Sequence, residues 1–219
     1  GEVSLAHRGV LFLDEMPEFS RNALEVLRQP LEDGRVTISR GAGTCDYPSR
    51  FMLVAAMIPC PCGYLGDERH TCRCSRSKRV EYRNRVSGPL LDRIDIQIEV
   101  SPVSYDMLSQ LPSGEPSAKI RERVMLARDI QSRRFADDPD VFCNADMRPR
   151  DVARYCRLDT RAQAALREKL PALDLSARAY DRVLKVARTV ADLRGADAVG
   201  DDDVNRAASW RALDRNYWN

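Results

Sequence analysis

The sequence has no apolar run approaching the roughly eighteen residues that a membrane-spanning helix needs. It also has no charged start followed by a hydrophobic segment and a small-residue cleavage site, so nothing marks a secretory leader. Aromatic residues make up only 6% of the 219 residues, and Lys plus Arg exceed Asp plus Glu by only two (35 against 33). These absences favour a cytoplasmic globular protein with no membrane partner and no overall basic surface.

Cysteine is present in an odd number, seven, and four of these residues crowd into residues 60–74. That arrangement suits metal ligation in a reducing compartment better than a disulfide framework. Free thiols on a loop and two disulfides are the alternatives, and His70 is either a substitute ligand or an exposed side chain. Cys45, Cys143 and Cys156 are isolated, which predicts buried or half-buried thiols. The pattern C-x-C…C-x-C predicts structural Zn²⁺ held by Cys60, Cys62, Cys72 and Cys74.

Residues 10–57 alternate between strand and helix patterns. Residues 10–13 (VLFL) are an apolar run without alternation, typical of a strand buried on both faces of a parallel sheet. A helix is expected next, with Ser20 as its N-cap and Asp33-Gly34 at its end. Residues 35–48 (RVTISRGAGTCDYP) predict a hairpin with a glycine-rich tip. A second buried strand is expected over residues 51–57.

The following region continues this alternation around an irregular segment. Residues 59–79 are rich in Cys, Pro, Gly and charge, which predicts an insertion without regular structure. A short helix over residues 80–86 and a third strand over 94–100 (IDIQIEV) are expected after it. Strands separated by helices imply an α/β sheet, so we predict an α/β domain over residues 1–111.

Beyond this domain the pattern becomes helical. PSGEP (112–116) is typical of a linker, and the helical patterns that follow include no convincing strand. The clearest helix is expected over residues 173–193, with Ser176 as its cap. We therefore predict an all-α domain over residues 112–219. The apolar face of the long helix is expected to carry Ala179, Val183, Val186, Val190 and Leu193.

Asp14 and Glu15 directly follow the first predicted strand. Open parallel sheets bind ligands in the crevice at the carboxyl ends of their strands, so the pair would lie at the edge of such a crevice. In P-loop NTPases an aspartate in this place holds Mg²⁺, and a following glutamate polarises the attacking water. The alternative is a strand end whose two acids are merely solvated.

Longer strings carry a resemblance to a known family. The sequence closely resembles the magnesium-chelatase-like AAA+ ATPases and, within them, the group of the competence protein ComM (YifB type). The resemblance implies a partial AAA+ P-loop NTPase core with a parallel sheet, followed by an all-α helical lid domain. The matching strings span almost the whole chain in family order and are AHRGVLFLDEMPEF, ALEVLRQPLEDGRVTISR, FMLVAAMIPCPCG, YRNRVSGPLLDRID and LSARAYDRVLKVARTVADL.

The resemblance implies roles for particular residues. Asp14 and Glu15 look like the Walker B pair, Arg93 like the arginine finger offered to a neighbouring subunit's ATP, and Arg178 like the sensor-2 arginine of the lid, which contacts the nucleotide. A guanidinium suits these two roles because its forked donors match phosphate oxygens. Without the resemblance, Arg93 would be read as a surface ion pair with a neighbouring aspartate, and Arg178 as part of a solvated helix face.

The sequence departs from the family pattern at two points. No G-x-x-x-x-G-K-[ST] occurs, and in the family this Walker A loop lies upstream of Walker B. Because the chain begins Gly1-Glu2-Val3 without an initiator Met, we expect a C-terminal fragment that starts just before Walker B and is inactive alone. Relatives carry the sensor-1 Asn where Ile58 stands here. Since isoleucine forms no side-chain hydrogen bonds, either hydrolysis is slow, another group substitutes, or the sequence carries a change.

Basic residues crowd between positions 69 and 85, against the single acid Glu81. They could contact DNA phosphates, as could the hairpin tip with Arg40 in a ring pore. Solvated charge beside a metal site is the alternative. Sparse aromatics favour backbone contact without sequence preference. The basic residues are Arg69, Arg73, Arg76, Lys78, Arg79, Arg83 and Arg85.

Three functions are open on these grounds. The leading one is an ATP-driven ring motor, expected to be a homohexamer, that acts on DNA during uptake and recombination by branch migration or a helicase-like activity. It would use ATP and Mg²⁺, with a structural Zn²⁺. The second is a chelatase motor that drives metal insertion into a tetrapyrrole, and the third is a non-hydrolysing, zinc-dependent DNA-binding or scaffolding module. The C-x-C pair and the string YRNRVSGPLLDRID favour the first.

Overall fold

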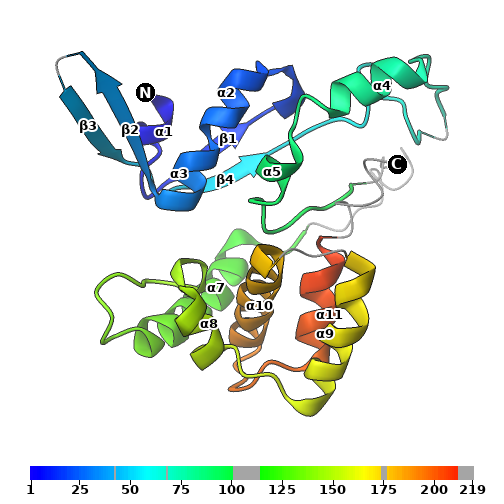
Figure 1. Cartoon of the computed structure of the whole chain (residues 1–219). Helices are drawn as coiled ribbons and strands as arrows, with labels where there is room; N and C mark the ends of the chain where they lie inside the picture. The colour runs from blue at the N-terminus through cyan, green and yellow to red at the C-terminus, as the bar shows by residue number, and fades with distance from the viewer. Residues whose placement is uncertain (42, 68, 101–113, 174–176, 212–219) are drawn as a thin grey trace. The chain divides into compact units, whose positions relative to one another are not determined.

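The computed structural model describes residues 1–211 except 42, 68, 101–113 and 174–176, and the side chains of Arg40 and of residues 170–178 are also not described (Figure 1). The chain forms two compact units, the first over Gly1–Ile94 and the second from Asp95 onward. The first is α/β and the second is helical, so the predicted fold class is confirmed. The predicted boundary between residues 111 and 112 lies outside the described residues and stays a prediction.

The α/β unit is built on two parallel strands, β1 (Val10–Leu13) and β4 (Met52–Ala55). Helices α2 (Arg21–Val26) and α5 (Gly88–Leu91) pack on one face of these strands, and each buried Leu there contributes about 1.5–3 kcal/mol. The prediction that β1 is buried on both faces is wrong for the described residues, because Val10 and Phe12 are each 58% exposed. The core of this unit consists of Leu13, Met16, Leu24, Leu27, Val86, Leu90 and Leu91.

The predicted first helix is divided into α2 (Arg21–Val26) and α3 (Arg28–Asp33). The division follows from Pro30, which has no N–H to donate to the carbonyl four residues earlier. Ser20 caps α2 as predicted, with its Oγ accepting from the Ala23 N–H at 3.2 Å. Gly34 ends α3 at φ +66°, and a Cβ there would lie 2.7 Å from the side chain of Arg50. Before them come α1 (Glu2–Leu5) and the 3-10 turn η1 (Met16–Glu18).

The predicted hairpin is confirmed by β2 (Arg35–Arg40) and β3 (Gly43–Pro48), which pair antiparallel. Thr37 Oγ1 donates to Asp46 Oδ1 at 2.6 Å across the pair. Every described side chain of β3 is exposed, so the hairpin contributes little to the core. Figure 1 shows it projecting at one end of the α/β unit, with α4 (Arg76–Arg83) at the other.

Two expectations for residues 59–100 are wrong: that the insertion stays irregular as far as residue 79, and that residues 94–100 form a strand. The helix expected over 80–86 is α4, which begins earlier, inside the predicted irregular insertion, because Ser75 caps it by accepting from the Lys78 N–H at 3.3 Å. A second short helix, α5 (Gly88–Leu91), follows. Residues 94–100 form no strand, since among the described residues no strand lies beside them to pair with, and Ile98 is 65% exposed.

The helical unit is arranged around α10 (Ala177–Leu193). Helices α7 (Ser117–Arg134) and α8 (Pro149–Tyr155) lie on one side of it, and α9 (Thr160–Leu173) and α11 (Asp201–Ser209) lie on the other (Figure 1). The expected cap, Ser176, lies outside the described residues. The expected apolar face is partly wrong: Val183 is fully buried, but Leu193 is 48% exposed and Arg188 and Asp192 are buried instead. The 3-10 turn η2 (Asn144–Asp146) lies between α7 and α8 in the chain.

None of the helices in the described part of the chain combines the length and the apolar character that a bilayer crossing requires.

Candidate functional site

The acidic pair lies at the carboxyl end of β1, beside the carboxyl end of β4. The Ala56 N–H donates to Leu13 O at 2.9 Å, and the Met16 N–H donates to Ala56 O at 2.9 Å. These two bonds continue the parallel pairing past the last strand residues and fix Asp14 and Glu15 at the edge of the sheet. Both side chains are exposed. The structure therefore places the pair where parallel sheets bind ligands.

Glu15 has a left-handed backbone, with φ 49° and ψ 49°, which is uncommon for a residue with a side chain. Its N–H donates to Asp14 Oδ1 at 3.0 Å, and its carbonyl accepts from the Glu18 N–H at 2.8 Å. The buried Met16 anchors the turn from below, at 1% exposure. This conformation turns the chain sharply after β1. The turn fixes the backbone that carries the two neighbouring carboxylates.

Ile58 follows β4 on the same edge of the sheet as the acidic pair, and its side chain is 38% exposed. An aliphatic side chain cannot donate a hydrogen bond to a phosphate or to a water. The departure from the family pattern that the sequence showed at Ile58 therefore holds in the structure. An apolar side chain lies where an asparagine was expected.

Arg93 lies just after α5, and its side chain is only 11% exposed. One terminal nitrogen donates to the carbonyl of Pro89 at 2.7 Å, and the other pairs with the carboxylate of Glu32 at the end of α3. Glu32 is 61 residues away in sequence, so sequence reasoning gave no signal for this partner. Of the two aspartates that flank Arg93, Asp95 pairs with Arg182 at 2.6 Å.

Arg178 lies in the first turn of α10, in the helical unit. Its side chain falls outside the described part of the structure. Its role as a sensor-2 arginine stays a prediction.

The four clustered cysteines converge as their spacing predicted. All four Sγ atoms lie within 4.8 Å of one another. A tetrahedral Zn²⁺ with Zn–S bonds of about 2.3 Å needs sulfur atoms about 3.8 Å apart, so the cluster fits that ion with little adjustment. Among the first three of these cysteines, the Sγ–Sγ separations are 3.4 Å for Cys60–Cys62, 3.6 Å for Cys62–Cys72 and 3.7 Å for Cys60–Cys72.

The thiols of this cluster differ in how readily they ionise. Cys62 accepts a hydrogen bond from the backbone N–H of Tyr64, which lowers its pKa to about 6. The hydrogen bond between Cys74 and Cys62 raises the pKa of Cys74 to about 11. One thiolate is thus stabilised by its neighbours before any ion arrives, and thiolate is the form that ligates metals.

His70 does not join the cysteine cluster. Its ring Nδ1 lies 3.4 Å from Asp67 Oδ2, and its ring stacks near Tyr64 with centroids 4.8 Å apart. Asp67 also accepts from the N–H groups of residues 69 and 70, which lowers its pKa. Of the isolated thiols, Cys143 is half-buried and Cys156 is buried as expected, but Cys45 is exposed because it lies on the solvated strand β3.

Helix α4 links the cysteine cluster to η1, the turn that follows the acidic pair. Its N-cap Ser75 directly follows Cys74. Two residues after the end of α4, Arg85 donates to the carbonyl of Pro17 at 3.3 Å and pairs with Glu18 at 3.1 Å. Tyr82 lies between the two sites at 2% exposure, and burial, then the carboxylates of Glu18 and Glu15, raise its pKa. Sequence reasoning treated Arg85 as one basic residue among several and missed its contact with η1.

The remaining basic residues of this region face solvent to different extents. Arg79 and Arg83 are half-buried on α4. The side chain of Arg40, at the hairpin tip, is not described. The exposed basic residues are Arg69, Arg73, Arg76 and Lys78.

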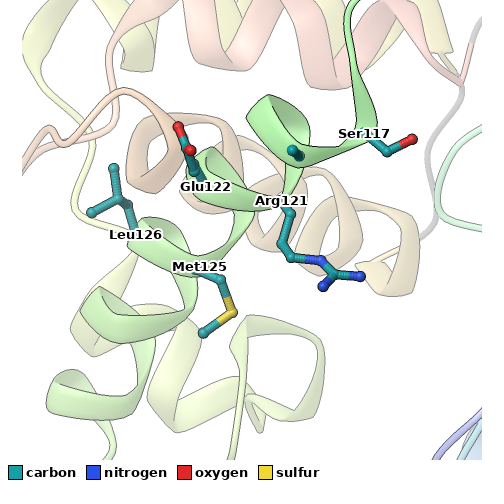
Figure 2. Close-up of a pocket in the computed structure, with 6 residues that line it drawn as sticks. Ser117, Arg121, Glu122, Met125 and Leu126 are labelled. Carbon is teal, nitrogen blue, oxygen red and sulfur yellow. The ribbon is translucent and has the colours of Figure 1, made fainter.

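A hollow beside α7 lies apart from these residues. Figure 2 shows Arg121 and Met125 projecting on one side of this helix and Glu122 and Leu126 on another. Since all of its lining residues come from α7, the hollow has a single wall and does not enclose a ligand. It carries none of the predicted site residues.

Two family models match the chain. The model of the magnesium chelatase subunit ChlI matches residues 1–108, and the model of the C-terminal part of the same subunit matches residues 114–211. The chain belongs to the magnesium-chelatase-like family. Within this family it falls in the ComM/YifB group, as the following relatives indicate.

The chain is 43% identical over 216 residues to the uncharacterized protein YifB of Salmonella typhimurium and 43% identical over 217 residues to the competence protein ComM of Haemophilus influenzae. An uncharacterized protein of Mycobacterium tuberculosis is 41% identical over 212 residues. These alignments cover 96–98% of the chain but only 41% of each relative. The resemblance predicted from the motifs is thereby confirmed, over less than half the length of the relatives.

Proposed function

We propose that this chain is the part of an ATP-driven ring motor that supplies the Walker B pair, an arginine finger and the lid. The observation that carries the proposal is the position of Asp14 and Glu15 at the carboxyl edge of the parallel strands β1 and β4. Membership of the magnesium-chelatase-like family supports it. The chain by itself contains no G-x-x-x-x-G-K-[ST] loop, so we expect hydrolysis only in the full-length protein.

The chemistry follows from the side chains at this edge. Asp14 would hold Mg²⁺, which neutralises charge on the phosphates. Glu15 would orient the attacking water and accept its proton, since its carboxylate is exposed at the sheet edge next to Asp14. Arg93 would contact the phosphates bound by a neighbouring subunit, and Arg178 those bound by its own. Because Arg93 acts in trans, hydrolysis would depend on assembly of a homo-oligomeric ring, which we propose to be a hexamer.

DNA is the proposed substrate of the motor. The exposed basic residues between Arg69 and Lys78 and the projecting β2–β3 hairpin support contact with a phosphate backbone. The relative that is named as a competence protein also favours DNA uptake and recombination as the setting.

The four cysteines are proposed to hold a structural Zn²⁺. The support is the mutual Sγ separation within 4.8 Å, which suits a tetrahedral thiolate site. All four ligand positions belong to the chain, so the site is closed and the ion would stabilise the fold rather than bind substrate.

The decisive experiment uses the full-length protein and its Glu15→Gln variant. We expect Mg²⁺-dependent ATP hydrolysis that DNA stimulates, and a loss of about 10²–10⁴-fold in kcat in the variant, because a general base contributes that much. ATP binding should persist. Glu2→Gln is the matched control, since Glu2 is also an exposed glutamate of the α/β unit and lies in α1.

Other outcomes would favour the alternatives. Stimulation by porphyrin-chelatase partners instead of DNA would favour a metal-insertion motor. Absence of hydrolysis, with zinc and DNA still bound, would favour a non-hydrolysing module, the alternative that Ile58 keeps in view.

A further inference from the structure

A charged groove of about 480 Å³ opens beside the expected arginine finger. Helices α2 and α3 form one wall, β2 forms another, and Arg93 lies among the lining residues. Gln29 Nε2 reaches Thr37 Oγ1 at 3.4 Å, which ties α3 to β2 across the groove. The groove therefore consists of neighbouring elements of one unit and does not depend on how the two units are arranged.

Arg93 is held inside this groove by its own chain. Its guanidinium donates to the carbonyl of Pro89, one turn earlier, and pairs with the Glu32 carboxylate. The arginine is 11% exposed, whereas Glu32 is 42% exposed. The carboxylate of the pair thus remains open to solvent and can leave Arg93 by turning into water, which would uncover the guanidinium for another anion.

We propose that Glu32 is a positioning residue that holds Arg93 in its own subunit until the neighbouring subunit presents nucleotide phosphate. This inference rests on the proposed role of Arg93 in trans. The phosphate and Glu32 compete for the terminal nitrogen of Arg93 that pairs with the Glu32 carboxylate, because both offer anionic oxygens to it. Arg93 exchanges one anion for the other when the ring closes.

The exchange has a physical consequence for assembly. Breaking the Arg93–Glu32 pair costs free energy that subtracts from the free energy gained at the subunit interface. A variant without the Glu32 charge releases Arg93 at no such cost, so its subunits associate at lower concentration. Partly exposed ion pairs are weak, which limits the expected gain to about two- to fivefold.

The experiment measures ring assembly of the full-length protein with Mg²⁺ and a non-hydrolysable ATP analogue. Mass photometry gives the subunit concentration at half-assembly for the wild type and for Glu32→Gln, which we expect to assemble at about two- to fivefold lower concentration. Glu32→Asp keeps the charge but shortens its reach, and should shift assembly in the same direction. The matched control is Asp33→Asn, which removes the adjacent charge of α3.

A double-mutant cycle with Arg93→Ala makes the result specific. Arg93→Ala should weaken assembly, and Glu32→Gln should add nothing in that background. If Arg93→Ala weakens assembly and Glu32→Gln leaves assembly unchanged or weakens it, the proposed role of Glu32 is overturned, whereas that of Arg93 is not. Unchanged assembly in Arg93→Ala overturns the proposed finger itself. An equal shift in Asp33→Asn overturns the specific pairing, because it reports a general effect of charge.

Discussion

At the scale of single residues, Asp192 of the helical unit is a buried carboxylate that accepts several hydrogen bonds. It is 1% exposed and accepts from Arg134 at 2.5 and 2.7 Å, from Arg188 at 3.0 Å and from Asn144 at 2.7 Å. Arg188, also 1% exposed, donates further to the carbonyls of Asp197 and Ala196. A charge buried this deeply is tolerated because every partner is present.

Asp192→Ala should therefore destabilise the helical unit by about 3–5 kcal/mol, since it leaves two arginines without their shared carboxylate. Urea unfolding followed by circular dichroism measures the change. Asp129→Ala is the control, because Asp129 is exposed on α7 and should alter the free energy of unfolding by less than about 0.5 kcal/mol. Equal effects of the two variants would refute a special role for the buried carboxylate.

At the scale of elements, the start of α8 shows how one acid ties a helix to its flanking loop. Asp151 Oδ2 accepts from the Arg148 backbone N–H at 3.0 Å and from Arg148 Nε at 2.8 Å. The hydrogen bond from the Arg148 side chain lowers the pKa of Asp151. The folded state thus favours the carboxylate, and this stabilisation is present above the unfolded pKa near 3.9 and is lost as pH falls through the folded value.

Asp151→Asn should cost about 0.5–2 kcal/mol at pH 7, and the difference from the wild type should shrink as pH falls below about 4. Urea unfolding measured at several pH values tests the sign. Asp140→Asn is the control, because Asp140 is 75% exposed and only approaches Arg148 at 4.0 Å. A destabilisation that grows toward low pH would contradict the pairing.

The cysteine cluster and α4 form the second element-scale unit, because Ser75, directly after Cys74, caps the start of α4, and Arg85, two residues after its end, pairs with Glu18. We expect about one equivalent of zinc in the purified protein, by elemental analysis. Cys62→Ser should lose it, and chelation should open α4 to limited proteolysis. Cys45→Ser and Cys143→Ser should retain the ion, since neither thiol belongs to the cluster. Absence of zinc with all four clustered thiols reactive would end the proposal.

At the scale of the whole molecule, the two units have separate hydrophobic cores, and each unit carries different residues of the proposed site. The α/β unit carries the acidic pair, Arg93 and the cysteines, and the helical unit carries Arg178. The chain spans 41% of the length of the relatives it matches. This is why the proposed tests of hydrolysis and assembly use the full-length protein.

Local sequence patterns were sufficient for several features. The apolar run before Asp14, the capping Ser20, the hairpin and the clustering of four cysteines are each set by residues close together in the chain, because strands, caps, turns and C-x-C pairs form from neighbours. The alternation over residues 94–100 misled, since a strand also needs a partner, and pairing is not a local property.

Tertiary structure alone decided which distant charges meet. Arg93 meets Glu32 across 61 residues, Arg85 meets Glu18 across 67, and Arg134 meets Asp192 across 58. The sequence contains 35 basic and 33 acidic residues, so composition permits a great many pairings. Folding selects among them because apolar packing determines where each backbone segment lies. Only the opposite charges that this packing brings within reach of each other can bond.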